Sequence, residues 1–155
     1  MTEAEGAVLL AYDGSDNAKR AIAAAGELFG PRRALVLHLW ESWVAEAPAL
    51  AGASTSVQGM AAELDTIAGE QSEGHTTEGV ELAAEAGFDP EGLSMEASGP
   101  IWKSVLDAAG RHDCAAIVVG SRGLTGISRV LGSVSNGVVH HSRRPVLVVP
   151  GEDEQ

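Results

Sequence analysis

The sequence is poor in cysteine, in aromatic residues and in long apolar runs. Its single cysteine, Cys114, excludes a disulfide framework and any zinc site that needs two or more thiolates. Aromatic residues make up only 4% of the chain, so the core must be built from Val, Leu, Ile and Ala. No apolar run reaches the roughly 18 residues of a membrane-spanning helix, and the N-terminus MTEAEG lacks the features of a signal peptide. We therefore expect a cytoplasmic protein without a membrane partner.

Positive charge is also scarce, and it is unevenly distributed. The net charge of −12 argues against a nucleic-acid partner, because affinity for nucleic acid comes mainly from Lys and Arg on phosphates. From Glu41 to Glu96 there are twelve acidic residues and no Lys or Arg, which is typical of a solvated helix face. From Arg111 to Val149, by contrast, there are five Arg and one acid, Asp113.

The length of 155 residues predicts one domain, over residues 1–150, followed by a disordered acidic tail at 151–155. Apolar runs predict buried strands at Ala7–Tyr12, Ala34–Trp40, Ala115–Val119 and Pro145–Val149, and a weaker pattern predicts a strand at Leu93–Ala97. Helical periodicity or helix-start signals predict helices from Ser15 or Asp16 to Gly30, over Val57–Phe88, from Pro100, and over Val134–His141. The Val57–Phe88 segment is one helix or two, because Gly69, Gly74 and Gly79 interrupt it. Residues 41–56 are expected to form a loop.

Five strands that alternate with four helices predict an α/β fold, in which an open parallel sheet has helices on both faces. Ligands of such folds bind beyond the carboxyl ends of the strands, where the strand order reverses. Two strand-end segments carry suitable chemistry. These are DGSDN after the first strand and GSRGLTGISRVLGSVS after the fourth.

The second segment is the strongest functional signal of the sequence. Glycine allows the backbone N–H groups to approach a ligand closely, and a helix N-terminus attracts anions. Ser133 and Ser135 add hydroxyl donors, Arg122 and Arg129 add positive charge, and no acid lies between Cys114 and Gly151. These features favour a phosphate site. The alternative is that the glycines only form a long connection.

Other phosphate-binding and catalytic motifs fit poorly. A P-loop needs Gly-Lys-Ser/Thr, and neither Lys19 nor Lys103 follows a glycine. A dinucleotide fingerprint would follow the first strand, and no Gly-x-Ser-x-Gly elbow exists for a hydrolase. His38 is interpreted as a buried histidine whose hydrogen bonds are satisfied, in preference to a catalytic base. The tryptophans either line a pocket or pack in the core. Asp13 is a turn residue or a ligand, and Ser15 a cap rather than a nucleophile.

The segment GSRGLTGISRVLGSVSNGVVHHSRRPVLVV resembles the nucleotide-binding signature of the universal stress protein family, which reads Gly, two residues, Gly, nine residues, Gly and Ser or Thr. Here the second spacer, LTGISRVL, has eight residues, so the last Gly-Ser pair either stays on the phosphates or moves off them. The AYDGS, LHLW and PVLVV segments extend the resemblance over essentially the whole chain.

The resemblance implies a Rossmann-like sheet of strand order 3-2-1-4-5 and an ATP-binding sensor or switch in stress response. It implies phosphate contacts from Gly120, Gly123, Gly132 and Ser133, adenine near Leu39, and Asp13 at the ribose or at Mg²⁺. The residues that we expect to bind the nucleotide are Ala11, Asp13, Leu39, Gly120, Arg122, Gly123, Gly132, Ser133, Val134 and Ser135.

The resemblance also places Val146–Val149 at the sheet edge, where an apolar strand invites pairing into a homodimer. Two other functions remain open. One is a family member that acts as a dimeric interaction module without nucleotide, and the other is a slow ATP hydrolase or phosphotransferase.

Overall fold

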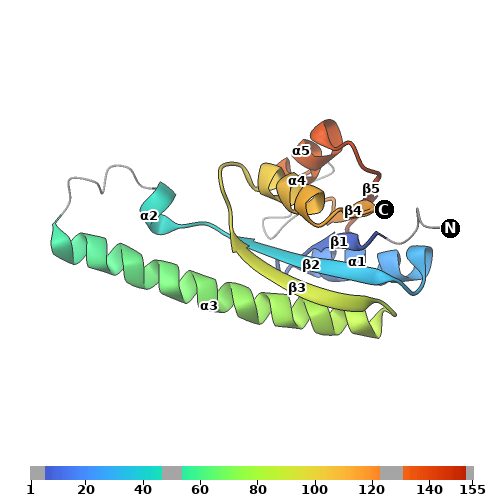
Figure 1. The fold of residues 1–155 in the computed structure, drawn as a ribbon, viewed down its shortest axis with the longest axis horizontal. Coiled ribbons are helices and arrows are strands. Elements are labelled where there is room, and N and C mark those ends of the chain that lie inside the picture. The colour runs from blue at the N-terminus through green and yellow to red at the C-terminus, as the bar shows by residue number, and fades with distance from the viewer. Residues whose placement is uncertain (1–5, 47–53, 123–130, 153–155) are drawn as a thin grey trace.

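The computed structural model describes residues 6–46, 54–122 and 131–152. Its centre is a five-stranded sheet in which neighbouring strands are parallel and the order is β3-β2-β1-β4-β5 (Figure 1). The strands are β1 (Val8–Ala11), β2 (Arg33–Trp40), β3 (Asp89–Glu96), β4 (Ala116–Gly120) and β5 (Val146–Val149). The helices are α1 (Asp16–Phe29), α2 (Trp43–Glu46), α3 (Thr55–Glu85), α4 (Ile101–Arg111) and α5 (Ser133–His141). The predicted fold class and strand order are confirmed.

Helices cover both faces of the sheet, and each face has its own core. Alternate strand residues point to opposite faces, so Val8 and Leu10 pack with α1 and α3, whereas Leu9 and Leu37 pack with α4 and α5. All four side chains are at most 1% exposed. The helix after β1 and the helix after β4 therefore lie on opposite faces, which makes the carboxyl ends of β1 and β4 the switch point of the sheet.

The segment after β2 differs from the expected loop. Residues 43–46 form α2, and α3 begins at Thr55 within the range predicted as irregular. The Asp65 carboxylate organises this region, because it accepts hydrogen bonds from Ser42 Oγ at 2.5 Å and from Trp43 N at 2.7 Å. Its partners are more than twenty residues away, so no local pattern signals the turn.

The helix α3 runs without a break through Gly69, Gly74 and Gly79, so the prediction of a single helix is the correct one of the two. At Gly79 the absence of a side chain is required, since a Cβ atom there would lie 2.7 Å from Val36 Cγ1 and 2.9 Å from Tyr12 Cδ2. This glycine lets the helix lie close to the sheet. The N-terminal half of α3 extends past the sheet, as Figure 1 shows.

Two further boundaries differ from expectation. The edge strand β3 begins at Asp89, four residues before the predicted start, because it pairs with β2 over its whole length. Pro90 is tolerated there since an edge strand has one side without ladder bonds. Of the predicted tail, Gly151 is buried and Glu152 pairs with Arg20 at 2.9 Å, and residues 153–155 lie outside the described part. No helix of the described residues is long and apolar enough to cross a membrane.

Candidate functional site

A pocket of about 270 Å³ lies at the switch point, beyond the carboxyl ends of β1, β2 and β4. Nine of the ten sequence-predicted site residues line it. They are Ala11, Asp13, Leu39, Gly120, Arg122, Gly132, Ser133, Val134 and Ser135. The tenth, Gly123, lies outside the described residues, as does Arg129. Segments that are more than a hundred residues apart in the chain thus meet around one cavity.

The pocket has an apolar part and a polar part. Leu37, Val105 and Val119 are almost completely buried, and with Leu39 and Ile101 they form an apolar wall between β2, β4 and α4. The polar part is formed by the loop after β1, the start of the loop after β4 and the first turn of α5. Such a division suits a ligand with a flat apolar body and a charged end.

Asp13 is a turn residue, and it also lines the pocket. Its Oδ1 accepts a hydrogen bond from Ser15 N at 2.9 Å, which closes an Asx turn at the end of β1. The same residue is half-buried and lines the pocket. Ser15 is a cap, because its Oγ accepts a hydrogen bond from Ala18 N at 3.1 Å at the start of α1.

The first turn of α5 contributes its helix N-terminus to the polar part of the pocket. Backbone N–H groups in the first turn of a helix have no partner within the helix, and the helix dipole places partial positive charge there. Ser133 is exposed and begins α5, with Gly132 as the N-cap residue. The φ angle of Gly132 is −62°, so its backbone conformation does not itself require glycine.

The carbonyl of Ser121 holds the two ends of the glycine-rich loop together. It accepts a hydrogen bond from Gly132 N at 2.7 Å and another from Ser135 Oγ at 3.0 Å. Ser135 is 2% exposed, and its hydroxyl also donates to the Gly132 carbonyl at 3.1 Å. This hydroxyl therefore stabilises the ends of the loop. With the eight-residue spacer, the Gly132-Ser133 pair still lies beside Gly120 at the pocket.

The sequence argument missed Asn17, which fixes the relative positions of three segments. Its Nδ2 donates to the Val149 carbonyl at 3.0 Å, and its Oδ1 accepts from Arg122 N at 2.8 Å. The residue is 7% exposed. Asn17 thereby connects α1, β5 and the loop after β4. The sequence does place a polar residue, Asn17, in the first turn of the predicted helix, but local sequence does not show its hydrogen-bond partners.

Tyr12 is a second pocket residue that was missed. It is 2% exposed, and its hydroxyl donates a hydrogen bond to the Glu78 carboxylate of α3. Burial and this hydrogen bond raise the pKa of the Tyr12 phenol, and the bond lowers the pKa of Glu78. The phenol therefore stays protonated, and it ties α3 to the β1 end of the pocket.

His38 lies on the opposite face of β2 from the pocket and does not line it. Its Nδ1 is 2.6 Å from Ser72 Oγ, and its ring stacks on His75 with the centroids 4.9 Å apart. Burial, followed by the charge of His75, lowers the pKa of His38 to about 4 against the opposing effect of Asp13. His38 is therefore a satisfied, neutral histidine, as the favoured interpretation predicted.

None of the three tryptophans lines this pocket. Trp102 stacks on His141 with the centroids 4.2 Å apart, and Trp40 packs near Gly69 of α3. Cys114 is buried, as expected of a core residue. Within the part of the chain that the structure describes, no group of three or more His, Cys, Asp or Glu side chains is placed to hold a metal ion.

Comparison with known proteins agrees with this architecture. The family model of the universal stress protein family matches residues 6–150. Universal stress protein YxiE of Bacillus subtilis is 32% identical over 145 residues, which cover 92% of this chain and 97% of that protein. A universal stress protein of Thermus aquaticus is 33% identical over 146 residues, which cover 92% of this chain and 96% of that protein.

Solved structures of the same kind share the fold. UspA of Lactobacillus plantarum superposes with a TM-score of 0.73 at 19% identity over 94% of this chain and 97% of that one. The Archaeoglobus fulgidus universal stress protein in complex with dAMP has a TM-score of 0.61 at 22% identity, covering 93% and 97%. A universal stress protein in complex with cAMP has a TM-score of 0.59 at 23% identity, covering 94% and 97%. The sequence matches and the common fold establish that this chain belongs to the universal stress protein family.

Proposed function

We propose that the pocket binds ATP and that nucleotide occupancy makes this protein a sensor or switch in stress response. The observation that carries the proposal is the division of one cavity into an apolar wall and a polar end formed by the N-terminus of α5. Two related structures hold dAMP and cAMP, which are adenine nucleotides. In the proposed complex, adenine packs on the wall that includes Leu39, and the phosphates meet the first turn of α5.

The charges around the cavity fit a phosphate ligand. Arg122 lines the pocket and is its one cationic residue among those described, whereas Asp13 is its one carboxylate. Mg²⁺ in nucleotide sites is commonly held by one or two carboxylates together with phosphate oxygens and water. Asp13 therefore fits as the protein ligand of a Mg²⁺ ion that neutralises phosphate charge, and its turn geometry fixes one carboxylate oxygen in place.

The pocket residues favour nucleotide binding over fast catalysis. No His, Cys or Lys is among the described residues that line the pocket, so a general base other than Asp13 is missing there. Slow hydrolysis of ATP stays a weaker alternative. The interaction-module alternative is favoured by one observation, which is the apolar edge strand β5.

We propose that β5 also forms a homodimer by antiparallel pairing with its copy. Val146, Leu147 and Val148 are each half-buried and lie at the open edge of the sheet. An apolar edge strand with an open row of backbone groups is a template for pairing with another chain.

Titration calorimetry with Mg-ATP, Mg-AMP and adenosine tests the nucleotide proposal. We expect saturable ATP binding with a dissociation constant in the micromolar to submillimolar range, roughly −5 to −8 kcal/mol, and weaker binding of adenosine. A natively purified sample should release an adenine nucleotide when it is denatured. The absence of both binding heat and thermal stabilisation at ~5 mM ATP would favour the interaction module instead.

A further inference from the structure

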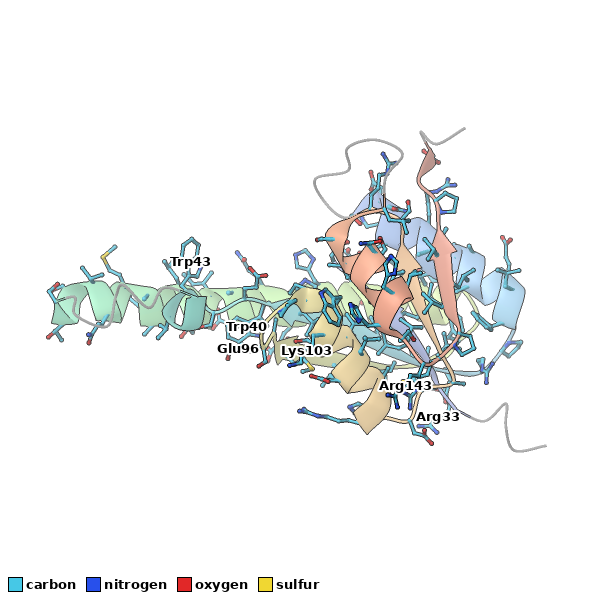
Figure 2. The ribbon with its side chains drawn as sticks, turned by 90° about the horizontal axis from the view of Figure 1, so that it is seen from above. Arg33, Trp40, Trp43, Glu96, Lys103 and Arg143 are labelled. Carbon is cyan, nitrogen blue, oxygen red and sulfur yellow. The ribbon has the colours of Figure 1, made fainter. Side chains whose placement is uncertain are left out.

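The projecting half of α3 carries an exposed row of large apolar side chains. Met60 is 63% exposed, Ile67 48%, Leu64 42% and Val57 38%. We call these four residues the arm stripe. The neighbouring helix α2 adds exposed Trp43, which lies over the same part of α3 in Figure 2. Large apolar residues that cluster on one exposed element indicate an interaction site more often than scattered ones do.

The arm stripe is separate from the face of α3 that packs on the sheet. The sheet-facing residues Ser72, Thr76 and Ala83 are buried, and the stripe lies roughly 110° around the helix axis from them at about 3.6 residues per turn. The stripe residues are spaced three, four and three apart, which is the spacing of the seam between two paired helices. A second helix is therefore the element that fits it.

Charge on the two borders of the stripe restricts the partner. Exposed Glu63 and Glu70 lie along one border. On the other border Ala61 is 5% exposed, so that side of α3 is already covered. From Glu41 to Glu96 the chain has no Lys or Arg, so nothing on the arm offsets these carboxylates.

These borders disfavour a second copy of the chain and an anionic bilayer as the occupant. If two copies of the arm stripe pair in antiparallel fashion with all four apolar residues matched, Glu63 of one copy lies opposite Glu63 of the other, and like charges at such positions repel. In a parallel pair the glutamates would have to approach the Ala61 side, which is already covered. An anionic membrane surface attracts basic segments and repels this acidic arm.

We propose that the arm stripe is a docking surface for an amphipathic helix of another protein, whose polar edge carries Lys or Arg. The apolar side of that helix would cover Met60 and Leu64, and its cations would pair with Glu63 and Glu70. The surface is independent of the nucleotide pocket, so the proposal stands apart from ATP binding. It gives this protein a means of contacting a partner while the pocket senses nucleotide.

Two synthetic peptides of four heptads each are suitable probes, with Leu at the seam positions and either Lys or Glu at the flanking positions. Fluorescence anisotropy with the full chain should show saturable binding of the Lys peptide and at least about tenfold weaker binding of the Glu peptide. Undetectable binding of the Lys peptide at ~100 μM protein, or equal binding of both peptides, would overturn the proposal.

Matched variants separate this surface from general attraction to an acidic protein. The double change Met60→Gln and Leu64→Gln should weaken the Lys peptide at least about tenfold, while Leu28→Gln, which alters a 68% exposed leucine on α1, should not. Glu63→Gln with Glu70→Gln should weaken binding more than Glu81→Gln with Glu85→Gln, which removes the same charge from the same helix. Equal losses within either pair would overturn the proposal.

Sedimentation velocity provides the remaining test. The oligomeric state should be the same for wild type and for Met60→Gln with Leu64→Gln, because the stripe is not expected to pair with its own copy. Conversion of a wild-type dimer to monomer by this double change would show that a second copy occupies the stripe, and the proposal would then be wrong. All of the changed residues are exposed, so the variants should fold.

Discussion

The side-chain amide of Asn17 lies against the Cα atom of Gly120, so closely that a Cβ atom at position 120 would stand 2.9 Å from Asn17 Cγ. Gly120 is thus a glycine because of a close approach at the end of β4 and not because of an unusual φ angle. The contact joins the first turn of α1 to the loop that begins the proposed phosphate site.

Gly120→Ala should therefore displace the Asn17 amide and its hydrogen bonds to Arg122 N and Val149 O. We expect a loss of about 1–3 kcal/mol in the free energy of unfolding, measured by urea denaturation. As a control, Gly110→Ala in α4 has open space for its Cβ and should be neutral or stabilising. The double variant with Asn17→Ala should lose less than the sum of the two single losses, and simple additivity would contradict the contact.

Ser133→Ala should weaken ATP much more than adenosine, because the exposed hydroxyl at the start of α5 is proposed to donate to a phosphate. The expected loss is about 1.5–3 kcal/mol, or roughly ten- to hundredfold in the dissociation constant measured by calorimetry. Ser135→Ala is the matched control. Its buried hydroxyl bonds the Ser121 carbonyl, so it should lower stability more than Ser133→Ala does. Equal ATP affinity in Ser133→Ala and wild type would remove Ser133 from the site.

Asp13→Asn keeps an oxygen that can accept from Ser15 N but removes the carboxylate charge. If Asp13 is a Mg²⁺ ligand, the variant should bind Mg-ATP about tenfold more weakly, whereas adenosine affinity should be nearly unchanged. Calorimetry in the presence of Mg²⁺ and of a chelator separates these effects. A similar loss for adenosine would place Asp13 at the ribose and not at the metal.

A proline at Val148 should prevent dimerisation while leaving the fold intact. Ile117 N donates to Pro145 O and Ser121 N donates to Val149 O, so the odd-numbered residues of β5 turn their backbone groups toward β4. The N–H group of Val148 therefore faces the open edge, and Val148→Pro blocks pairing there. Light scattering at ~100 μM should change from dimer to monomer.

Leu147→Pro is the informative comparison, because the backbone N–H of Leu147 faces β4. This change should lower the melting temperature through the loss of an internal ladder bond. A wild-type protein that is already monomeric would rule out dimerisation through β5.

The neutral His38 should make the protein less stable in mild acid. The pKa of His38 is about 4 in the fold against 6.5 in the unfolded chain, so the unfolded state binds the proton more readily. The contribution of neutral His38 to the free energy of unfolding is therefore fully present above pH 6.5 and is lost as the pH is lowered toward 4. The free energy of unfolding should fall by about 1–2 kcal/mol between pH 7 and pH 5. In His38→Asn, urea denaturation at pH 7, 6 and 5 should show a flatter dependence. An unchanged slope would contradict the burial of a neutral imidazole.

Apart from α2, local sequence determined the succession of strands and helices, because each depends on apolar spacing within one short segment. The run AVLLAY and the run AAIVV have apolar side chains at every position, as strands buried on two faces require, and they became β1 and β4. Asp13 in the loop after β1 and the glycine-rich segment that follows β4 are likewise local features. Together with the parallel topology, they indicate from sequence alone where the pocket lies.

Only the tertiary structure decided which residues meet across the chain, because those contacts join distant segments through geometry that no local pattern contains. Asn17 bonds Val149 over 132 positions, and Asp65 holds the turn before α2 from 22 positions away. The same reason explains why His38 was ambiguous. Its neutral state depends on burial and on the nearby His75 of α3, and both arise only once α3 packs on β2. The projecting half of α3 could not be predicted from sequence either, since helical periodicity predicts the helix but not how far it extends beyond the sheet.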